Sequence, residues 1–417
     1  MIALSAAMTL PTSTLAADEE LGALALESAP VESMPASATP TRLFVESALG
    51  RTQGRSGAPS RDVRRVSVDL VHASRIAPGW RAVVSDRLDP IRPAEPGSDA
   101  TLNSLREGYL SWSDEAATAV VEVGRINVRN GPGYGYNPTD FFRDGALRAV
   151  TTANPFALRE NRMGTVALRA QKLWSGGSVT AVLSPKLDDA RSGKAFSLDL
   201  GATNNRNRGL LTLSQQWSDR VSGQVLLYKD SGSRVQPGAS LTALLSDAVV
   251  GHFEWSSATG SGMADGGTGV PASGGRGHRL ASGLTFTTST KLSLTAELQF
   301  NGLSLGAAEW DRLARSNPLA LGTYLLDAQR QQELAPRRAY MLYATQRDAG
   351  IKNLDLTAFL RVNAVDHSRL AWLDVRYHWP KVDLAIQWQQ TSGSALSEYG
   401  FAPERRNLQA LLSFHLQ

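Results

Sequence analysis

The stretch KLSLTAELQFN, residues 291–301, alternates between polar and apolar side chains without a break. Because successive side chains of a β-strand point to opposite faces, one face of this stretch is apolar and the other is polar. Such a strand can cover a soluble core. Repeated around a closed sheet with its apolar side outward, it would instead face lipid and line a watery lumen. In that second arrangement we expect Glu297 to face water inside the barrel.

The composition narrows the class of protein. The chain has 417 residues, no Cys and 42% hydrophobic residues. This length allows several soluble domains or one large barrel. The lack of Cys excludes a disulfide framework and a thiolate metal site. The net charge is +4 and the cations are scattered along the chain, which argues against a nucleic-acid-binding protein.

The first residues indicate export from the cytoplasm. Residues 1–10 are small and apolar, and Thr14-Leu15-Ala16-Ala17 offers a cleavage point. We therefore predict a signal peptide at 1–17, although its usual basic start is missing, and a disordered N-terminus is the alternative. Residues 18–41 are rich in Ala, Pro, Ser and Glu and show no periodicity, which is typical of a flexible periplasmic lead-in. The remaining residues, 42–417, form the predicted barrel.

The rest of the chain contains no run of about 18 apolar residues, so no transmembrane helix is predicted. A membrane protein without such helices has to be a closed barrel, because open sheet edges are not tolerated in lipid. Further alternating segments fall at 210–217, 249–256, 354–363 and 381–389. A run of about 9–11 residues is what a tilted strand needs to cross a bilayer.

The connections between these strands follow a regular order. Short turns fall near positions 77, 113, 175, 218, 246, 289, 348 and 379, and between them lie longer Gly- and Pro-rich connections at 51–62, 89–104, 128–162, 187–209, 231–237, 259–277, 303–336 and 393–405. The one exception is a short turn near Val365-Asp366 in a long-loop position. Outer-membrane barrels have this asymmetry between short periplasmic turns and long outer loops. It predicts an all-β, transmembrane, antiparallel up-and-down barrel of about eighteen strands (sixteen to twenty), with residues 195–200 in an outer loop.

One motif carries a family resemblance. Val123-Gly124-Arg125-Ile126-Asn127 is followed by GPGYGYNPTDFF at residues 131–142. This segment looks like the strand-then-loop part of porin-like families related to alginate export. The chain as a whole resembles Gram-negative outer-membrane barrels, a group that includes porins and polysaccharide-export channels. The resemblance implies an outer-membrane channel for passive passage of hydrophilic solutes, or for export of a polysaccharide.

The loop that carries this motif is a candidate constriction. Its glycines allow sharp bends and its prolines stiffen it. Folded into the lumen, it would place positive charge from Arg125, Arg143 and Arg162 near the constriction, opposed by Asp140. The alternative, in which the loop only covers the barrel mouth, stays open at this stage.

The expected lumen carries charges of both signs. The candidates on inward faces are Arg169, Glu254, Glu297, Arg347, Asp355, Arg361, Asp374, Arg376 and Asp383. Rings of such charges tune the preference of a channel for ions and solutes. The same residues could instead pair across strands and stiffen the wall. Their balance is too even to predict the charge of a preferred solute.

No catalytic constellation is predicted. Six His residues are spread along the chain without metal-ligand spacing. His378 and Asp374 share a predicted face, but no serine elbow motif accompanies them. We therefore expect no enzyme, no cofactor and no bound metal.

The leading hypothesis is a porin-like channel. Its expected partners are outer-membrane lipid and lipopolysaccharide, the barrel-assembly machinery and an unidentified hydrophilic solute, and a homo-oligomer is left open. The first alternative is a structural or assembly barrel whose lumen is closed. The second alternative is a soluble periplasmic all-β protein.

Overall fold

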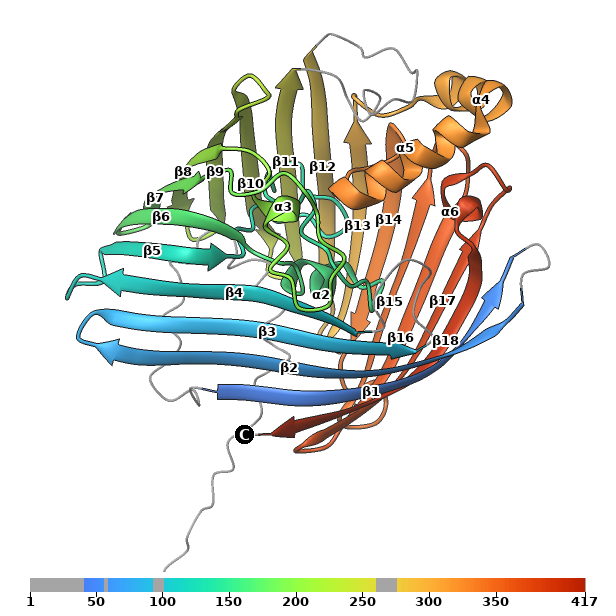
Figure 1. The fold of residues 1–417 in the computed structure, drawn as a ribbon, viewed down its shortest axis with the longest axis horizontal. Helices are drawn as coiled ribbons and strands as arrows, with labels where there is room; N and C mark the ends of the chain where they lie inside the picture. The colour runs from blue at the N-terminus through green and yellow to red at the C-terminus, as the bar shows by residue number, and fades with distance from the viewer. Residues whose placement is uncertain (1–40, 56–58, 93–100, 260–275, 417) are drawn as a thin grey trace, which may run out of the picture.

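A computed structural model describes residues 41–55, 59–92, 101–259 and 276–416. Within them, eighteen strands form one sheet in which all the pairings are antiparallel. Each strand pairs with its neighbour in the chain, and β1 pairs with β18, so the sheet closes into a barrel. The predicted fold class and the predicted number of strands are confirmed (Figure 1).

Most of the strands match or exceed the length needed to cross a membrane, and the shortest, β5 and β7, have eight residues each. They are β1 Thr41–Gly54, β2 Arg61–Ala77, β3 Trp80–Arg92, β4 Thr101–Ser113, β5 Ala119–Ile126, β6 Thr165–Trp174, β7 Gly177–Ser184, β8 Arg208–Ser218, β9 Val221–Asp230, β10 Gln236–Ser246, β11 Val249–Thr259, β12 Arg276–Thr287, β13 Leu292–Asn301, β14 Arg338–Gln346, β15 Leu354–Asn363, β16 Arg369–His378, β17 Val382–Ser392 and β18 Glu404–Leu416.

The faces of the strands follow the predicted alternation. On β13, the Leu298 side chain is 49% exposed on the outside, whereas its neighbour Glu297 is only 3% exposed on the inside. The outer surface at the short-connection end carries the exposed rings of Trp80, Trp174 and Trp379. Indole rings occupy this position at the boundary between lipid and water. The barrel therefore presents an apolar band outward and a polar surface inward.

Short and long connections alternate as expected. Residues 195–200 form no strand, because α3 (Leu200–Thr203) and the residues before it lie in the long connection between β7 and β8. The predicted signal peptide and nearly all of the lead-in, residues 1–40, lie outside the described residues.

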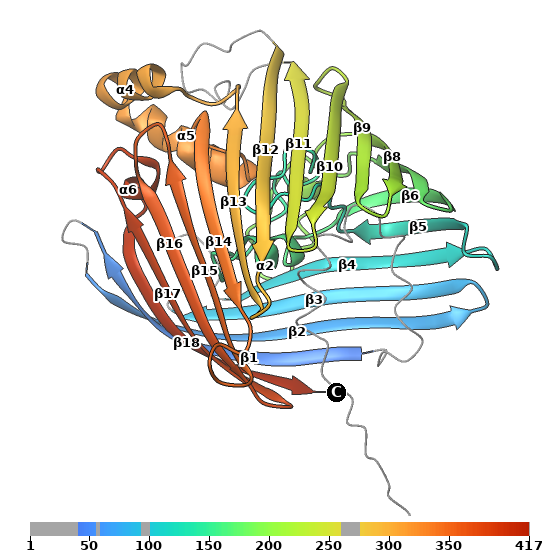
Figure 2. The ribbon, with the colours of Figure 1, turned by 180° about the vertical axis from the view of Figure 1, so that it is seen from behind.

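Helices occur in the long connections. They are α2 Pro155–Glu160, α3 Leu200–Thr203, α4 Ala307–Ser316, α5 Pro318–Gln331 and α6 Glu398–Phe401. The N-terminus of helix α5 is stabilised because Pro318 has no N–H to satisfy and the Asn317 side chain accepts a hydrogen bond from the Ala320 amide. Figures 1 and 2 show α4 and α5 over one end of the barrel and α2 within its outline. Within the described residues, no helix is both long and apolar enough to cross a membrane.

Candidate functional site: an inner loop held against the barrel wall

The connection between β5 and β6, residues 127–164, folds into the barrel, and we call it the inner loop. It contains the GPGYGYNPTD motif and helix α2. Its Phe142 and Val128 join an apolar cluster with Leu226 and Tyr228 on the inward face of β9. The Phe141 ring stacks on the Tyr228 ring with 4.7 Å between centroids. Of the two arrangements left open by the sequence, the structure adopts the one in which the loop enters the lumen.

Glu254 on β11 anchors the first part of the motif. Its carboxylate accepts hydrogen bonds from the Gly133 amide at 2.6 Å and from the Asn137 side chain at 2.9 Å. Its other oxygen accepts from the Thr139 hydroxyl at 2.8 Å and from the Thr139 amide at 3.3 Å. The Glu254 side chain is fully buried. All of these donors are neutral groups, and they supply hydrogen bonds to both oxygens of a buried carboxyl group.

Glu297 on β13 anchors the following residues. It accepts hydrogen bonds from the Tyr134 amide at 2.6 Å and from the Gly135 amide at 3.0 Å. The Gln299 side chain donates to it at 2.6 Å. The expectation that Glu297 faces water is therefore wrong, because the inner loop covers it.

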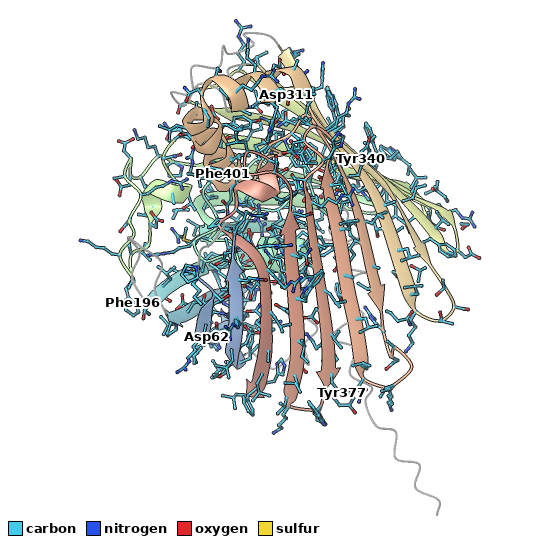
Figure 3. The ribbon with its side chains drawn as sticks, turned by 90° about the vertical axis from the view of Figure 1, so that its right-hand side faces the viewer. Asp62, Phe196, Asp311, Tyr340, Tyr377 and Phe401 are labelled. Atoms are coloured by element: carbon cyan, nitrogen blue, oxygen red, sulfur yellow. The ribbon has the colours of Figure 1, made fainter. Side chains whose placement is uncertain are left out.

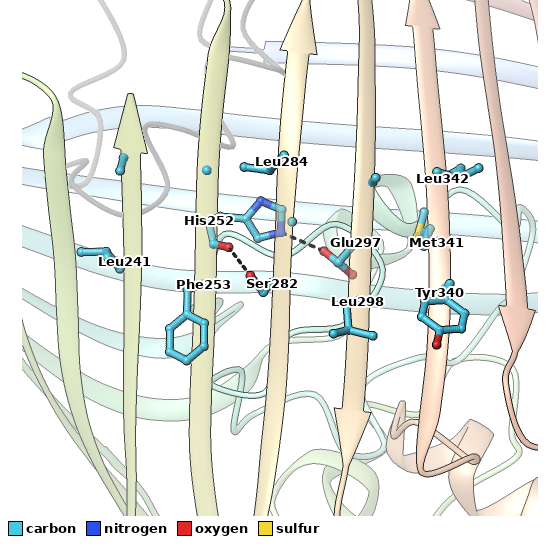
Figure 4. Close-up of a pocket in the computed structure, with 14 residues that line it drawn as sticks. Leu241, His252, Phe253, Ser282, Leu284, Glu297, Leu298, Tyr340, Met341 and Leu342 are labelled. Atoms are coloured by element: carbon cyan, nitrogen blue, oxygen red, sulfur yellow. Dashed lines mark hydrogen bonds and ion pairs between the residues drawn. The ribbon is translucent and has the colours of Figure 1, made fainter. Parts of the chain in front are cut away.

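A histidine completes this second anchor. The His252 Nε2 atom on β11 lies 3.1 Å from the Glu297 carboxylate, across β12 (Figure 4). Gly283 on β12 pairs with both residues in the strand register, so its missing side chain leaves room for their contact. A methyl group at Gly283 would come within 2.5 Å of the His252 ring.

The glycines of the motif are required because the loop backbone lies very close to side chains of the barrel wall. Gly131 has φ +89°, a region that side chains disfavour, and a methyl group there would collide with the Glu254 carboxylate. A methyl group on Gly135 would collide with the Met341 sulfur and the Gln299 side chain. The motif therefore needs glycine at positions 131 and 135, because there the loop backbone itself contacts the wall.

A third anchor joins the inner loop to the helical connection between β13 and β14. The Tyr136 hydroxyl donates to the Glu333 carboxylate at 2.8 Å, and the Arg143 guanidinium forms an ion pair with the same carboxylate. Burial alone would raise the pKa of Glu333, but the charges of Arg143 and Arg279 hold the pKa below its usual value. Two elements far apart in the sequence are thus tied by a buried charge pair.

Ion pairs also hold the inner loop together internally. The Arg162 guanidinium donates to Asp140 at 2.7 Å, and both side chains are buried. Arg159 donates to the Gly131 carbonyl at 3.2 Å and the Asn130 carbonyl at 3.0 Å. Burial lowers the pKa of Arg159 to about 10, although the Asp140 charge opposes this shift.

The other basic candidates make most of their contacts with parts of the chain outside this loop. Arg125 donates to the Leu105 carbonyl at 3.0 Å and to the Leu198 carbonyl at 2.6 Å, so it holds the β7–β8 connection. Arg169 forms an ion pair with Glu122 on the neighbouring strand. Arg347 lies in the short connection that follows β14. Arg361 on β15 acts electrostatically on Glu398 in α6.

The acidic candidates on β15 to β17 form local pairs. Asp374 pairs with Arg376 at 3.1 Å and accepts from Gln387 at 2.7 Å. Asp383 and Asp355 both contact His378, at 2.9 Å and 3.4 Å. His378 and Asp374 lie on the same face of β16, as predicted, and the contacts of His378 are with Asp383 and Asp355.

Sequence reasoning missed an ionic network on β1 to β4. Arg106 donates to both oxygens of Asp69, at 2.6 and 2.7 Å, and Arg87 contacts Asp89 at 3.1 Å. Arg65 pairs with Glu46 at 2.7 Å. The period of two in these strands places Arg65 and Asp69 on one face, so the pattern could have revealed the network. Among the described residues, no group of His, Asp and Glu side chains could hold a metal ion.

The closed barrel, the loop inside it and the sorting of short and long connections define a class of fold, the outer-membrane porin. Neither a known protein family nor a curated protein matches the sequence at a significant level.

Solved porins share this fold. The chain is similar to Acinetobacter baumannii OccAB1, with a TM-score of 0.57, 11% identity, and coverage of 90% of this chain and 96% of that one. It is similar to Acinetobacter baumannii OccAB4, with a TM-score of 0.57, 8% identity, and coverage of 92% and 99%. It is also similar to Pseudomonas aeruginosa OccK5 (OpdH), with a TM-score of 0.53, 12% identity, and coverage of 90% and 97%. The predicted resemblance to Gram-negative porin-like barrels is confirmed at the level of the fold.

Proposed function

We propose that the protein is a porin-like channel through which small hydrophilic solutes cross the outer membrane passively. The observation that carries the proposal is the anchoring of the inner loop to one wall by Glu254 and Glu297. A loop fixed inside a closed barrel narrows the lumen without needing to move, and the remaining walls carry charged and polar side chains. Such walls keep the lumen wetted and set its preference for solutes.

Single-channel recording in planar bilayers tests the proposal. Folded protein is expected to give stable steps of conductance, and folded protein that inserts without conducting would overturn the channel. Glu254→Ala should raise the conductance because it removes one of the anchors of the inner loop and loosens it. Leu298→Arg changes only the lipid-facing side of β13, so it is the control for effects on insertion.

We propose small solutes rather than a polysaccharide as cargo. The inner loop is tied to the wall at several points, and this supports a narrow passage. Uptake by vesicles containing the protein should fall steeply from monosaccharides to longer oligosaccharides. Equal passage of long, charged polysaccharide chains would favour the export function instead.

A barrel with a closed lumen is the second candidate, since the connections at one end are tied to one another. The Trp310 indole N–H donates to the Leu396 carbonyl at 3.2 Å, which joins α4 to the β17–β18 connection. The Gln332 side chain donates to the Arg143 carbonyl at 2.5 Å. Native protein that does not conduct, together with conductance that appears only after the α4–α5 connection is shortened, would favour this candidate.

A further inference from the structure

The inner loop leaves one side of the lumen open. Against β14 to β16 the lumen is filled, because Phe156 of α2 packs on a buried aromatic cluster that includes Tyr343 and Trp372. Beyond this cluster the inward side chains stay partly exposed. The exposed fraction is 25% for the Arg376 side chain on β16 and 14% for the Glu46 side chain on β1. The open passage therefore follows the inner faces of β16, β17, β18 and β1, which are neighbours in the sheet.

Four amide side chains stand close together on β17 and β18, and we call them the amide patch. They face the lumen, because Ile386 and Leu408, which alternate with them along the two strands, are exposed on the outside. The strand register places the members directly opposite one another in two pairs, Gln387 with Gln409 and Gln389 with Asn407. Figure 3 shows the outside of this part of the barrel, with Tyr377 at the short-connection end of β16 and Phe401 in α6 at the other end.

A hydrogen-bond relay fixes how part of the amide patch presents its atoms. The Gln387 side chain donates to the Asp374 carboxylate at 2.7 Å, and the Gln409 side chain donates to the Gln387 oxygen at 2.7 Å. Because an ionised carboxylate can only accept, Asp374 sets the direction of the whole relay. The relay ends at the oxygen of the partly exposed Gln409, and no side chain in the described ranges donates to that oxygen. The patch therefore offers a free acceptor to the lumen.

Asn407 provides a second acceptor beside the first. Its Oδ1 atom is buried and has no hydrogen-bond partner among the described residues. Gly50 on β1, which pairs with Gln409, carries no side chain over this corner, and a methyl group there would lie 3.6 Å from the Asn407 oxygen. A buried amide oxygen without a donor is costly. A solute that supplies a donor in the lumen would remove this cost.

The charged groups beside the amide patch are balanced. Asp374 pairs with Arg376 at 3.1 Å, and Glu46 on β1 pairs with Arg65 at 2.7 Å. The four amides themselves carry no charge. The patch and its flanking acids therefore offer no strong partner to an ionised solute, whether that solute is a cation or an anion.

Hydroxyl groups match the chemistry of the amide patch. An amide side chain both donates and accepts hydrogen bonds, and so does a hydroxyl group, whereas a carboxylate only accepts and an ammonium group only donates. Opposite amides on paired strands lie about 5 Å apart, and amides two residues apart on one strand lie about 7 Å apart. A compact molecule with several hydroxyl groups can reach more than one of them at once.

We infer that the amide patch binds small, uncharged, polyhydroxylated solutes such as monosaccharides, and that the channel prefers them to charged molecules of the same size. The inference rests on the proposed function, and it names the class of solute for that passage. The free oxygens of Gln409 and Asn407 accept from solute hydroxyls, and the amide N–H groups of the patch donate to them.

The test compares three forms of the full-length folded protein in detergent. The first is the native chain, and the second is a patch variant with Asn407→Leu and Gln409→Leu. The third is a matched control with Gln171→Leu and Gln216→Leu, which removes two inward amides on β6 and β8, away from the patch. Titrations followed by saturation-transfer NMR measure the binding of glucose, of the cationic glucosamine and of the anionic glucuronate. These three sugars share one ring and differ in charge.

We expect the native chain and the control to bind glucose more tightly than either charged sugar. The patch variant should bind glucose about fivefold more weakly, which is the order of change for the loss of one net hydrogen bond. A patch variant that binds glucose as tightly as the native chain would overturn the inference. Native protein that binds glucosamine or glucuronate as tightly as glucose would overturn it as well.

A second variant keeps the test decisive if the patch variant does not fold. Asn407→Asp preserves the size of the side chain and adds one negative charge to the patch. It should reverse the preference, so that glucosamine binds more tightly than glucose. An unchanged preference for glucose in this variant would place the binding site elsewhere in the protein and contradict the inference.

The proposed function fails separately from this inference, because binding is measured without a membrane. Protein that conducts in bilayers but shows no preference for glucose contradicts only the inference. Protein that binds glucose at the patch but does not conduct contradicts only the channel.

Discussion

Inward carboxylates on two walls of the barrel are stabilised in different ways. On β11 and β13, Glu254 and Glu297 accept hydrogen bonds mainly from backbone amides and neutral side chains of the inner loop and the wall. On β2 and β3, Asp69 and Asp89 are surrounded by arginines. The first wall uses its acids to hold a segment of chain, and the second wall compensates its own charges. Inward acids of one sheet can therefore have two roles. Where the inner loop covers them, they hold the loop in position, and where arginines surround them, they balance charge.

The largest loss of stability should come from a substitution on the wall that holds the inner loop, formed by β11 and β13. Glu254→Ala leaves the Gly133 amide and the Thr139 hydroxyl without their acceptor, and it removes one of the three acceptors of the Asn137 side chain. Each unsatisfied buried group costs about 1–3 kcal/mol, so we expect a loss of about 3–5 kcal/mol after partial rearrangement. Urea unfolding in detergent measures the loss. Glu254→Gln keeps one acceptor oxygen and should lose less than half as much; an equal loss for both would mean that the hydrogen bonds are not what anchors the loop.

Glu398 in α6 is an intermediate case, a buried carboxyl that has both an arginine and an acid as neighbours. Burial raises its pKa from 4.5 to about 7, with Asp366 adding to the rise and Arg361 opposing it. Because the pKa is raised in the folded state, ionisation opposes folding. The α6 connection is therefore most stable below pH 4.5 and loses stability as the pH rises toward 7.

The size of this loss is roughly 3 kcal/mol, from the conversion of a pKa difference into free energy. Hydrogen exchange of the β17–β18 connection at pH 5 and pH 8 measures it. After correction for the intrinsic rise of amide exchange with pH, Glu398→Gln should make the protection factors of this connection nearly equal at pH 5 and pH 8. Unchanged pH dependence in that variant would place the titrating group elsewhere.

The smallest effect on stability is expected on the wall formed by β2 and β3, where arginines surround the acids. Asp69→Asn keeps the size of the side chain and some hydrogen bonding to Arg106, so we expect a loss of only about 1–2 kcal/mol. It also leaves the lumen with one more unpaired positive charge. The reversal potential in a salt gradient should shift toward anion selectivity, whereas Glu254→Gln should barely change it. A larger shift for Glu254→Gln would reverse the roles assigned to the two walls.

The sequence predicts the barrel better than the site. The period of two in segments such as β13 and the alternation of short and long connections are local patterns, so the strand number follows from them. The acceptors of the inner loop are not local, since Gly133 and Glu254 are separated by 121 residues. The glycines indicate that the backbone bends, but they do not indicate which residues of the wall accept its hydrogen bonds. For the same reason Glu297 is predicted to face water, although the loop covers it.

The closure of the barrel has a consequence for how the chain folds. The final pairing joins Leu43 to Leu416, from the first strand of the sheet to the last. Contacts so distant in sequence are slow to form, because the entropy of closing the intervening chain is lost before the contact stabilises anything. Until they form, the unfinished sheet exposes two unpaired edges of β1 and β18 that can pair with other chains. We therefore expect that unassisted refolding of the purified chain is slow and that its yield falls as protein concentration rises.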